Sequence, residues 1–344
     1  MNEELQTYTL RVLRELLAAD SPSGFTARAA DYAIEKLRED GYEPRLTRKG
    51  GVLCCLGGTD AENALLLSAH IDTLGAMVAE VKGNGRLRLT PIGGFDANNA
   101  EAECVRVYTR DGKTVDGTIQ LANASIHVNR AYRTTERTFD TVECVLDCAA
   151  KNADEVRALG IDTGCYVCAD PRTVITESGY IKSRFLDDKL SAAILLGLAH
   201  HLHTENITPA RRLWLHLTVF EELGHGASAT MPEGVTEMLG VDMGCVGDGL
   251  ACTEREVSIC AKDSSGPYDY AMTSRLIACA KERGLGYAVD VYPFYSSDCS
   301  AAQRTYDVPA ALIGAGVYAS HGYERSHVDG VRNTFELIAA YAGV

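Results

Sequence analysis

The fold of this chain is decided by one stretch of sequence, Trp214-Leu215-His216-Leu217-Thr218-Val219-Phe220-Glu221-Glu222-Leu223-Gly224-His225-Gly226. Its first half is apolar and rich in residues that favour β-structure, which predicts a strand buried on both faces of a sheet. The strand then ends in two adjacent carboxylates, and charges at the mouth of a buried strand are costly unless a metal ion or a base compensates them. Adjacent side chains on an extended chain point to opposite sides, so Glu221 and Glu222 can have different partners.

A solvated acidic loop would leave the same local pattern, so the interpretation depends on what ends the other strands. Further acids and histidines do follow predicted strands or begin the elements after them: His70, Asp72, Asp187, Asp242 and His321. In open α/β sheets, functional groups gather at the carboxyl ends of the strands. A set that mixes imidazoles with carboxylates suits zinc, cobalt or manganese, whereas calcium and magnesium prefer oxygen ligands alone.

Composition limits the classes of partner. The 344 residues include 33 Lys+Arg against 47 Asp+Glu, a net charge of −14, which argues against a nucleic-acid backbone or an anionic membrane as partner. No apolar run is long enough to span a bilayer, and the first residues do not resemble a signal peptide. The 12 cysteines lie in apolar contexts typical of reduced core residues. We therefore expect a cytoplasmic protein.

The chain alternates between helical and strand patterns, except in one long segment. Helical spacing in Leu5–Ala19 and Thr26–Glu39 precedes the apolar strand Ala64–Ala69. After Asp72 the pattern changes to short alternating pieces joined by turns such as Arg110-Asp111-Gly112-Lys113, a hairpin signal. We predict an α/β domain formed by residues 1–72 and 169–344, with residues 73–168 as an inserted β-rich domain.

The joint order of these motifs resembles a known family, the two-metal aminopeptidases that assemble as tetrahedral dodecamers. This group includes glutamyl and deblocking aminopeptidases and some members labelled cellulases or endoglucanases. The resemblance covers nearly the whole chain and is carried by His70-Ile71-Asp72, Leu186-Asp187-Asp188-Lys189, Glu221-Glu222-Leu223-Gly224, Val241-Asp242 and Ser320-His321. It implies a zinc-exopeptidase-like mixed sheet flanked by helices. The insert would be a barrel or PDZ-like domain that makes the dimer contact.

The same resemblance implies a role for each site residue. It implies two divalent metal ions per subunit, zinc first, with cobalt or manganese as alternatives. One ion would be bound by His70 and Asp242 and the other by Glu222 and His321, with Asp187 bridging them. Glu221 would be the general base, and Asp72 would orient His70 by holding its second nitrogen.

Two positions stay open at the level of sequence. The family usually continues its late histidine as His-Ser-Pro-x-x-Glu, whereas this chain has His321-Gly322-Tyr323-Glu324, and His327 is a competing ligand. Asp248 competes with Asp242, because both follow apolar stretches. This chain also has Asp188 and Lys189 where the family often has asparagine and arginine.

The resemblance implies removal of N-terminal residues from short peptides with a free N-terminus, by a homo-oligomer in which dimers build a dodecamer. An alternative is another two-metal amide hydrolase of the same clan, such as a dipeptidase or an amidohydrolase. A non-catalytic metal-binding scaffold is a second alternative. Endoglucanase activity fits less well, because glycoside hydrolysis uses a pair of carboxylic acids.

Overall fold

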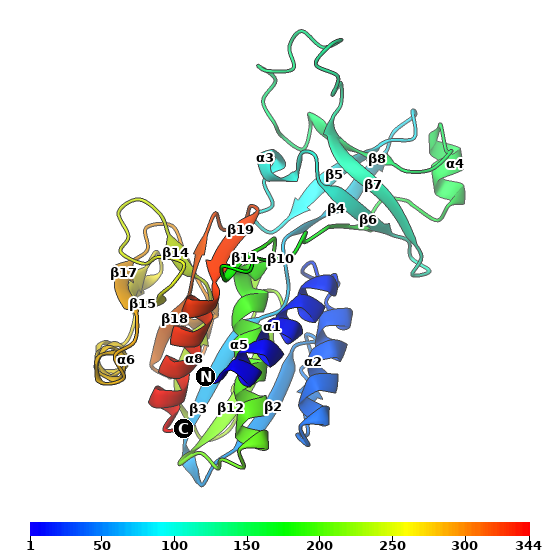
Figure 1. The fold of residues 1–344 in the computed structure, drawn as a ribbon. Helices are drawn as coiled ribbons and strands as arrows, with labels where there is room; N and C mark the ends of the chain where they lie inside the picture. The colour runs from blue at the N-terminus through cyan, green and yellow to red at the C-terminus, as the bar shows by residue number, and fades with distance from the viewer. The chain divides into compact units, whose positions relative to one another are not determined.

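The structure, a computed structural model, describes all residues from 1 to 344. The chain divides into two compact units, one formed by Met1–Asp72 with Arg172–Val344 and the other by Thr73–Pro171. The sequence-based division set the end of the insert at residue 168. Figure 1 shows the two units as ribbons, the first with a large sheet and long helices and the second composed mainly of strands. None of the helices is both long and apolar enough to cross a lipid bilayer.

The first unit is built on a 13-stranded mixed sheet. The main strand order is β1-β2-β12-β3-β13-β18-β19-β11-β10, with β14, β15, β16 and β17 attached beyond β18. The strands are β1 (Arg45–Leu46), β2 (Val52–Gly57), β3 (Asp60–His70), β10 (Val174–Ile175), β11 (Tyr180–Ser183), β12 (Arg211–Thr218), β13 (Val235–Val241), β14 (Gly244–Val246), β15 (Val257–Asp263), β16 (Gly266–Pro267), β17 (Tyr287–Val291), β18 (Ala310–Tyr318) and β19 (Glu324–His327).

The centre of this sheet is parallel. Strand β3 pairs in parallel with β12 on one side and β13 on the other, and β13 pairs in parallel with β18. The inner residues of these strands are almost completely buried, as in Leu213, Leu215 and Leu217 of β12. A sheet covered on both faces requires continuous apolar strands, which explains the run that opens the deciding stretch.

Helices cover the sheet and supply the rest of the core. They are α1 (Glu3–Ala18), α2 (Ala27–Glu39), α5 (Leu186–Thr204), α6 (Tyr270–Glu282), α7 (Asp298–Gln303) and α8 (Val328–Ala342). In Figure 1, α1, α2, α5 and α8 lie in front of β2, β3 and β12. Helix α5 is buried along most of its length, because α1, α2 and α8 enclose it against the sheet.

The second unit is a closed barrel with the strand order β4-β5-β8-β7-β6-β9. Its elements are β4 (Gly75–Val81), β5 (Leu87–Ile92), α3 (Ala97–Ala100), β6 (Cys104–Tyr108), β7 (Thr114–Leu121), β8 (Val142–Leu146), α4 (Ala153–Ala158) and β9 (Tyr166–Ala169). The predicted hairpin joins β6 to β7, and Gly112 at its tip has a positive φ of 83° that favours glycine. The predicted α/β fold with a β-rich barrel insert is confirmed.

The parallel strands bring the site together. Because they run in the same direction, the ends of β3, β12 and β13 share one edge of the sheet, and His70, Glu221 and Asp242 lie at or just beyond those ends. Strand β18 passes close to this edge. A Cβ atom at Gly314 would lie only 1.4 Å from the backbone oxygen of Asp242, so this approach requires glycine.

Candidate metal centre

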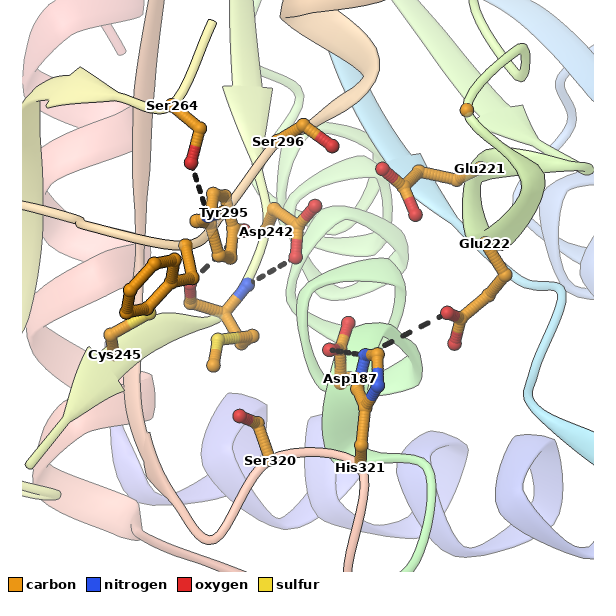
Figure 2. A pocket seen from close by; sticks show the side chains of 13 residues that line it. Asp187, Glu221, Glu222, Asp242, Cys245, Ser264, Tyr295, Ser296, Ser320 and His321 are labelled. Atoms are coloured by element: carbon orange, nitrogen blue, oxygen red, sulfur yellow. Dashed lines mark hydrogen bonds and ion pairs between the residues drawn. The ribbon is translucent and has the colours of Figure 1, made fainter. Parts of the chain in front are cut away.

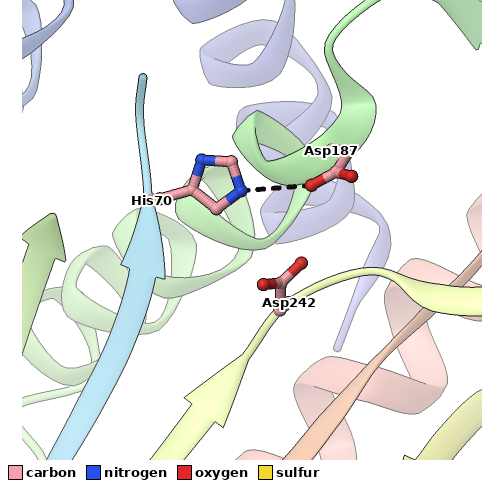
Figure 3. Close-up of side chains that lie close together, drawn as sticks. All are labelled: His70, Asp187 and Asp242. Carbon is pink, nitrogen blue, oxygen red and sulfur yellow. Dashed lines mark hydrogen bonds and ion pairs between the residues drawn. The ribbon is translucent and has the colours of Figure 1, made fainter. Parts of the chain in front are cut away.

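Three buried side chains from separate elements form a potential metal site. His70 is the last residue of β3, Asp187 is the second residue of α5, and Asp242 directly follows β13. One ligand atom from each lies within 4.8 Å of the other two, and all three residues are buried. Figure 3 shows the imidazole of His70 and the carboxylate of Asp187 facing each other, with the carboxylate of Asp242 beside them.

The imidazole of His70 is oriented by the backbone. Its Nδ1 atom lies 2.9 Å from the carbonyl oxygen of Asp72, and because a carbonyl only accepts, Nδ1 carries the hydrogen. The Nε2 atom then points toward Asp187, 3.1 Å from Oδ1. In the neutral ring this nitrogen has a lone pair, the form in which histidine binds a metal ion.

The other oxygen of Asp187 faces a second pair of residues. Its Oδ2 atom lies 3.6 Å from Nε2 of His321, and that nitrogen lies 3.7 Å from Oε2 of Glu222. Figure 2 shows these three side chains converging on the same side of the cavity. Asp187 thus lies between a His70–Asp242 group and a Glu222–His321 group.

These separations fit the residues' use as metal ligands. Two nitrogen or oxygen atoms bound to one tetrahedral zinc ion lie about 3.4 Å apart, given bonds of about 2.1 Å. The contacts of His321 are too long for hydrogen bonds, so hydrogen bonding does not explain why these groups face each other. The donor set and its spacing therefore fit divalent metal ions.

The electrostatics of the site also favour the binding of cations. Burial and the charge of Asp187 raise the pKa of Asp242 to about 7. Burial also raises the pKa of Glu222 well above its usual range, with Asp187 again adding to the effect. The pKa of Glu221 is raised by burial and by the charge of Asp242, although His70 acts in the opposite direction. The cluster holds more negative charge than its own histidines balance, and a cation would relieve this excess.

Glu221 and Glu222 lie in the short 3-10 turn η1 (Glu221–Leu223) that follows β12. Their side chains are only 12% and 5% exposed, and both reach the cavity. The Oε2 atom of Glu221 lies 3.7 Å from Nε2 of His70. The two carboxylates therefore face different histidines, Glu221 toward His70 and Glu222 toward His321.

Asp72 is placed differently from the expected contact with His70. Its carboxylate oxygen Oδ1 lies 3.5 Å from Nδ1 of His70, farther than the carbonyl oxygen of the same residue. The carboxylate instead accepts hydrogen bonds from the hydroxyl of Ser23, at 2.5 Å, and from the backbone N–H of Glu221, at 3.2 Å. Asp72 thus orients the imidazole through its backbone and holds the turn of Glu221 through its side chain.

The two competing residues lie outside the cluster. Both ring nitrogens of His327 have partners, because Nε2 lies 2.9 Å from the carbonyl oxygen of Ser178 and Nδ1 accepts the N–H of Asp329 at the start of α8. Asp248 is exposed in the turn after β14. The structure brings together His321 and Asp242 with the other candidate residues.

Sequence reasoning missed two buried carboxylates that hold the site's backbone. Glu324 accepts the backbone N–H groups of Asp187, at 3.1 Å, and His321, at 3.0 Å. Asp298 accepts the hydroxyl of Thr218 and, at 2.7 Å, the backbone N–H of Ala227. Glu324 stands three residues after His321 in the sequence, but only the fold reveals which N–H groups the two acids reach.

The site opens into a cavity of about 520 Å³. Asp187, Glu221, Glu222, Asp242 and His321 line one part of it, as Figure 2 shows. A water molecule or a small substrate group can therefore reach the candidate ligands from solvent. His70 lies behind them and is almost completely buried.

The chain matches the M42 glutamyl aminopeptidase family over residues 50–337. It is 41% identical over 334 residues to a Bacillus subtilis protein named "Putative aminopeptidase YhfE", a match that covers 97% of this chain and 96% of that protein. A glutamyl aminopeptidase of Lactococcus lactis is 26% identical, over 62% of this chain and 59% of the relative.

Solved structures share the fold at lower identity. Aminopeptidase APDkam598 from Desulfurococcus kamchatkensis superposes with a TM-score of 0.87 at 21% identity, covering 98% of this chain and 95% of that chain. The TET1 peptidase of Pyrococcus horikoshii has a TM-score of 0.84 at 20% identity, covering 97% of this chain and 99% of that chain. The family match and the Bacillus relative together show that this chain belongs to the M42 glutamyl aminopeptidase family and is a hydrolase of the metallo-aminopeptidase type.

Proposed function

We propose that this protein removes N-terminal residues from short peptides at a site that holds two divalent metal ions, with Glu221 as general base. The observation that carries the proposal is the position of Asp187, whose two oxygens face His70 and His321 at 3.1 Å and 3.6 Å. One carboxylate between two histidine–carboxylate pairs is the donor arrangement that a pair of metal ions requires.

Each metal position would have its own set of ligands. His70 and Asp242 would hold one ion, Glu222 and His321 would hold the other, and Asp187 would contact both. Two imidazoles and three carboxylates suit zinc, with cobalt or manganese as alternatives. Metal ions bound there would supply a water of lowered pKa and an electrophile for the scissile carbonyl group.

Glu221 is the residue best placed to move protons. Its carboxylate points into the cavity (Figure 2), lies 3.7 Å from His70, and is not required for either ligand set. As a carboxylate it would accept a proton from the attacking water and then pass it to the leaving amine. Asp72 would support this role, because its carboxylate accepts the backbone N–H of Glu221 and holds the turn in place.

The acidic part of the cavity lining, formed by Asp187, Glu221, Glu222 and Asp242, would also explain a requirement for a free N-terminus. A peptide with a free α-amino group brings a positive charge or a lone pair to the acid-lined part of the cavity, where a carboxylate or a metal position can bind it. An acylated N-terminus has neither. We therefore expect exopeptidase activity and no cleavage within long chains.

Replacing Glu221 by glutamine should remove almost all turnover while leaving the metal ions bound. The amide keeps the shape of the side chain but cannot accept the proton, so kcat should fall about 10²- to 10⁴-fold, the typical contribution of a general base. Steady-state hydrolysis of aminoacyl-p-nitroanilides and elemental analysis measure the two effects. The matched control is Glu233→Gln, which replaces an exposed acid on the loop that follows η1. A Glu221→Gln protein with near-normal turnover would exclude this role.

Replacing single ligands should reveal two metal positions with one shared residue. Asp242→Ala or Glu222→Ala should leave about one ion per subunit after dialysis, whereas Asp187→Ala should leave almost none, because its carboxylate faces both groups. Asp248→Ala, which removes an exposed acid outside the cluster, should keep the wild-type content. Inductively coupled plasma mass spectrometry gives the stoichiometry. Equal metal loss from all three ligand variants would contradict a bridging role for Asp187.

Metal ions should stabilise the protein more at alkaline pH. In the metal-free protein Asp242 has a pKa of about 7, whereas the pKa of an aspartate in an unfolded chain is about 4. A raised native pKa contributes stability at low pH that is lost as pH rises through about 7. The gap in Tm between metal-loaded and metal-stripped protein should therefore widen from about pH 5.5 to pH 8.

Differential scanning fluorimetry at both pH values measures this gap. Metal-stripped Asp242→Asn protein serves as control, because without this carboxyl its Tm should fall less as pH rises. A gap in Tm that stays constant or narrows toward pH 8 would contradict this account of the site.

We further propose that the barrel unit makes a dimer contact and that dimers assemble into a dodecamer. Support comes from the solved relatives that share the fold, among them a TET1 peptidase described as assembling into a tetrahedron or a large octahedral shell. Multi-angle light scattering should then give a mass about 12 times that of the 37.1 kDa chain. A stable monomer would exclude this assembly and leave the chemistry of the site unaffected.

A further inference from the structure

We infer that the active-site cavity selects an uncharged, apolar N-terminal side chain, such as leucine or methionine, and discriminates against glutamate and lysine. The inference rests on the proposed function, because it assigns the substrate class of the same site. It departs from the glutamyl preference in the name of the matching family. Its basis is the part of the cavity lining that is formed by uncharged side chains, beside Asp242 and across from Glu221 and Glu222.

This part, which we call the neutral wall, contains no charged side chain. It consists of Met243, Cys245, Ser264, Phe294, Tyr295 and Ser296, with Ser320 at its edge. Figure 2 shows Cys245, Ser264 and Tyr295 on one side of the cavity, with Asp242 beside Tyr295, and Glu221 and Glu222 on the other side. No lysine or arginine lines any part of the cavity. A substrate carboxylate would therefore find no cation on this wall.

The polar atoms of the neutral wall are largely committed to the protein. The hydroxyl of Tyr295 donates to the carbonyl oxygen of Met243 at 3.3 Å. The hydroxyl of Ser264 donates to the carbonyl oxygen of Pro293, at 3.0 Å, and accepts the backbone N–H of Tyr295, at 2.9 Å. These hydrogen bonds leave ring, thioether and thiol surface for a substrate, together with the hydroxyls of Ser296 and Ser320.

Packing behind the wall keeps its shape. The ring of Tyr295 lies edge-on to that of Tyr292, with centroids 5.0 Å apart. Tyr292 is fully buried, and its hydroxyl donates to Ser258 at 2.6 Å. This packing supports Tyr295 as a boundary of the cavity.

Phe294 is the clearest sign of an apolar occupant. It lines the cavity, yet its side chain is 95% exposed, the largest exposure among the big hydrophobic residues of the chain. An aromatic ring left in water at the mouth of a binding site gains from covering an apolar group of the substrate. A leucine or methionine side chain would bury this ring.

Two lysines close to cavity-lining residues are engaged in other contacts. The ammonium group of Lys262, two residues before Ser264, donates to the carbonyl oxygen of Asp263 at 2.8 Å. Lys49 contacts the carbonyl oxygen of His225 and, at 3.1 Å, the hydroxyl of Ser228. Neither lysine lines the cavity.

The charge balance of the site gives no advantage to a substrate side chain of either charge. Asp187, Glu221, Glu222 and Asp242 supply four negative charges, which two divalent cations would neutralise. On the neutral wall, a glutamate side chain would be desolvated without a cation, and a lysine side chain would find no acid among the wall residues. Burial of an unpaired charge costs far more than a lost apolar contact.

Kinetics on a panel of aminoacyl-p-nitroanilides tests this inference. We expect kcat/KM for leucyl and methionyl substrates to exceed that for glutamyl and lysyl substrates by about 100-fold or more, since burial of an unpaired charge is strongly disfavoured. A glutamyl or lysyl substrate that is cleaved as fast as the leucyl one would overturn the inference while leaving the aminopeptidase function intact.

A binding measurement separates selectivity from turnover. Isothermal titration of metal-loaded Glu221→Gln protein with leucine amide, glutamate α-amide and lysine amide should give a dissociation constant for leucine amide at least about tenfold lower than the others. If no substrate in the panel is cleaved, the proposed function fails, and these titrations still decide the inference. Equal or tighter binding of glutamate α-amide would refute it.

A charge added to the neutral wall should shift the preference. Ser296→Lys should raise the ratio of glutamyl to leucyl kcat/KM by about tenfold, because it supplies the missing cation. The matched control is Ser265→Lys, at an exposed serine outside the cavity, which should behave as wild type. Phe294→Lys, at a position where misfolding is not expected, provides a second variant. An unchanged ratio of glutamyl to leucyl kcat/KM in both wall variants would show that the neutral wall does not determine the side-chain preference.

Discussion

The structure depends on one constraint, the gathering of several carboxylates at the ends of parallel, buried strands. Asp187, Glu222 and Asp242 come together because β3, β12, β13 and the start of α5 end or begin at the same edge of the sheet. Like charges at this separation in a poorly solvated site repel each other strongly. Burial and this repulsion raise the pKa values of Glu222 and Asp242, and bound divalent cations would reduce the repulsion.

Two further acids, Asp72 and Glu324, hold the backbone around this cluster in place. Asp72 and Glu324 do not face solvent; each accepts backbone N–H groups from residues of the cluster, Glu221 in one case and Asp187 with His321 in the other. Backbone donors satisfy these carboxylates without adding a competing positive side chain. The positive charge that the cluster lacks can therefore come from metal ions, and the residues that position the ligands do not compete with them.

The cavity combines two surfaces with different chemistry. Its acidic part suits metal ions and a free α-amino group, whereas the neutral wall around Tyr295 and Phe294 suits an apolar side chain. Most residues of both parts lie at or just beyond the ends of strands of one sheet. Chemistry shared by a family can therefore stay constant while the side-chain preference changes through a few residues such as Ser296.

The sequence by itself determined the α/β class, the β-rich insert and the set of candidate residues. Short, largely apolar runs between turn signals, such as Leu65–Ala69, favour buried strands, and acids or histidines after them indicate one edge of a sheet. The tertiary structure decided what local pattern cannot. His327 is spaced like a ligand, yet its ring nitrogens are used by Ser178 and the start of α8, whereas His321 faces Glu222. The carboxylate of Asp72 reaches Glu221 more closely than it reaches His70, and Glu324 reaches two backbone groups 137 and 3 residues away along the chain. Such contacts depend on loop conformation and on the register of strands distant in sequence, and neither is encoded in the spacing of a motif.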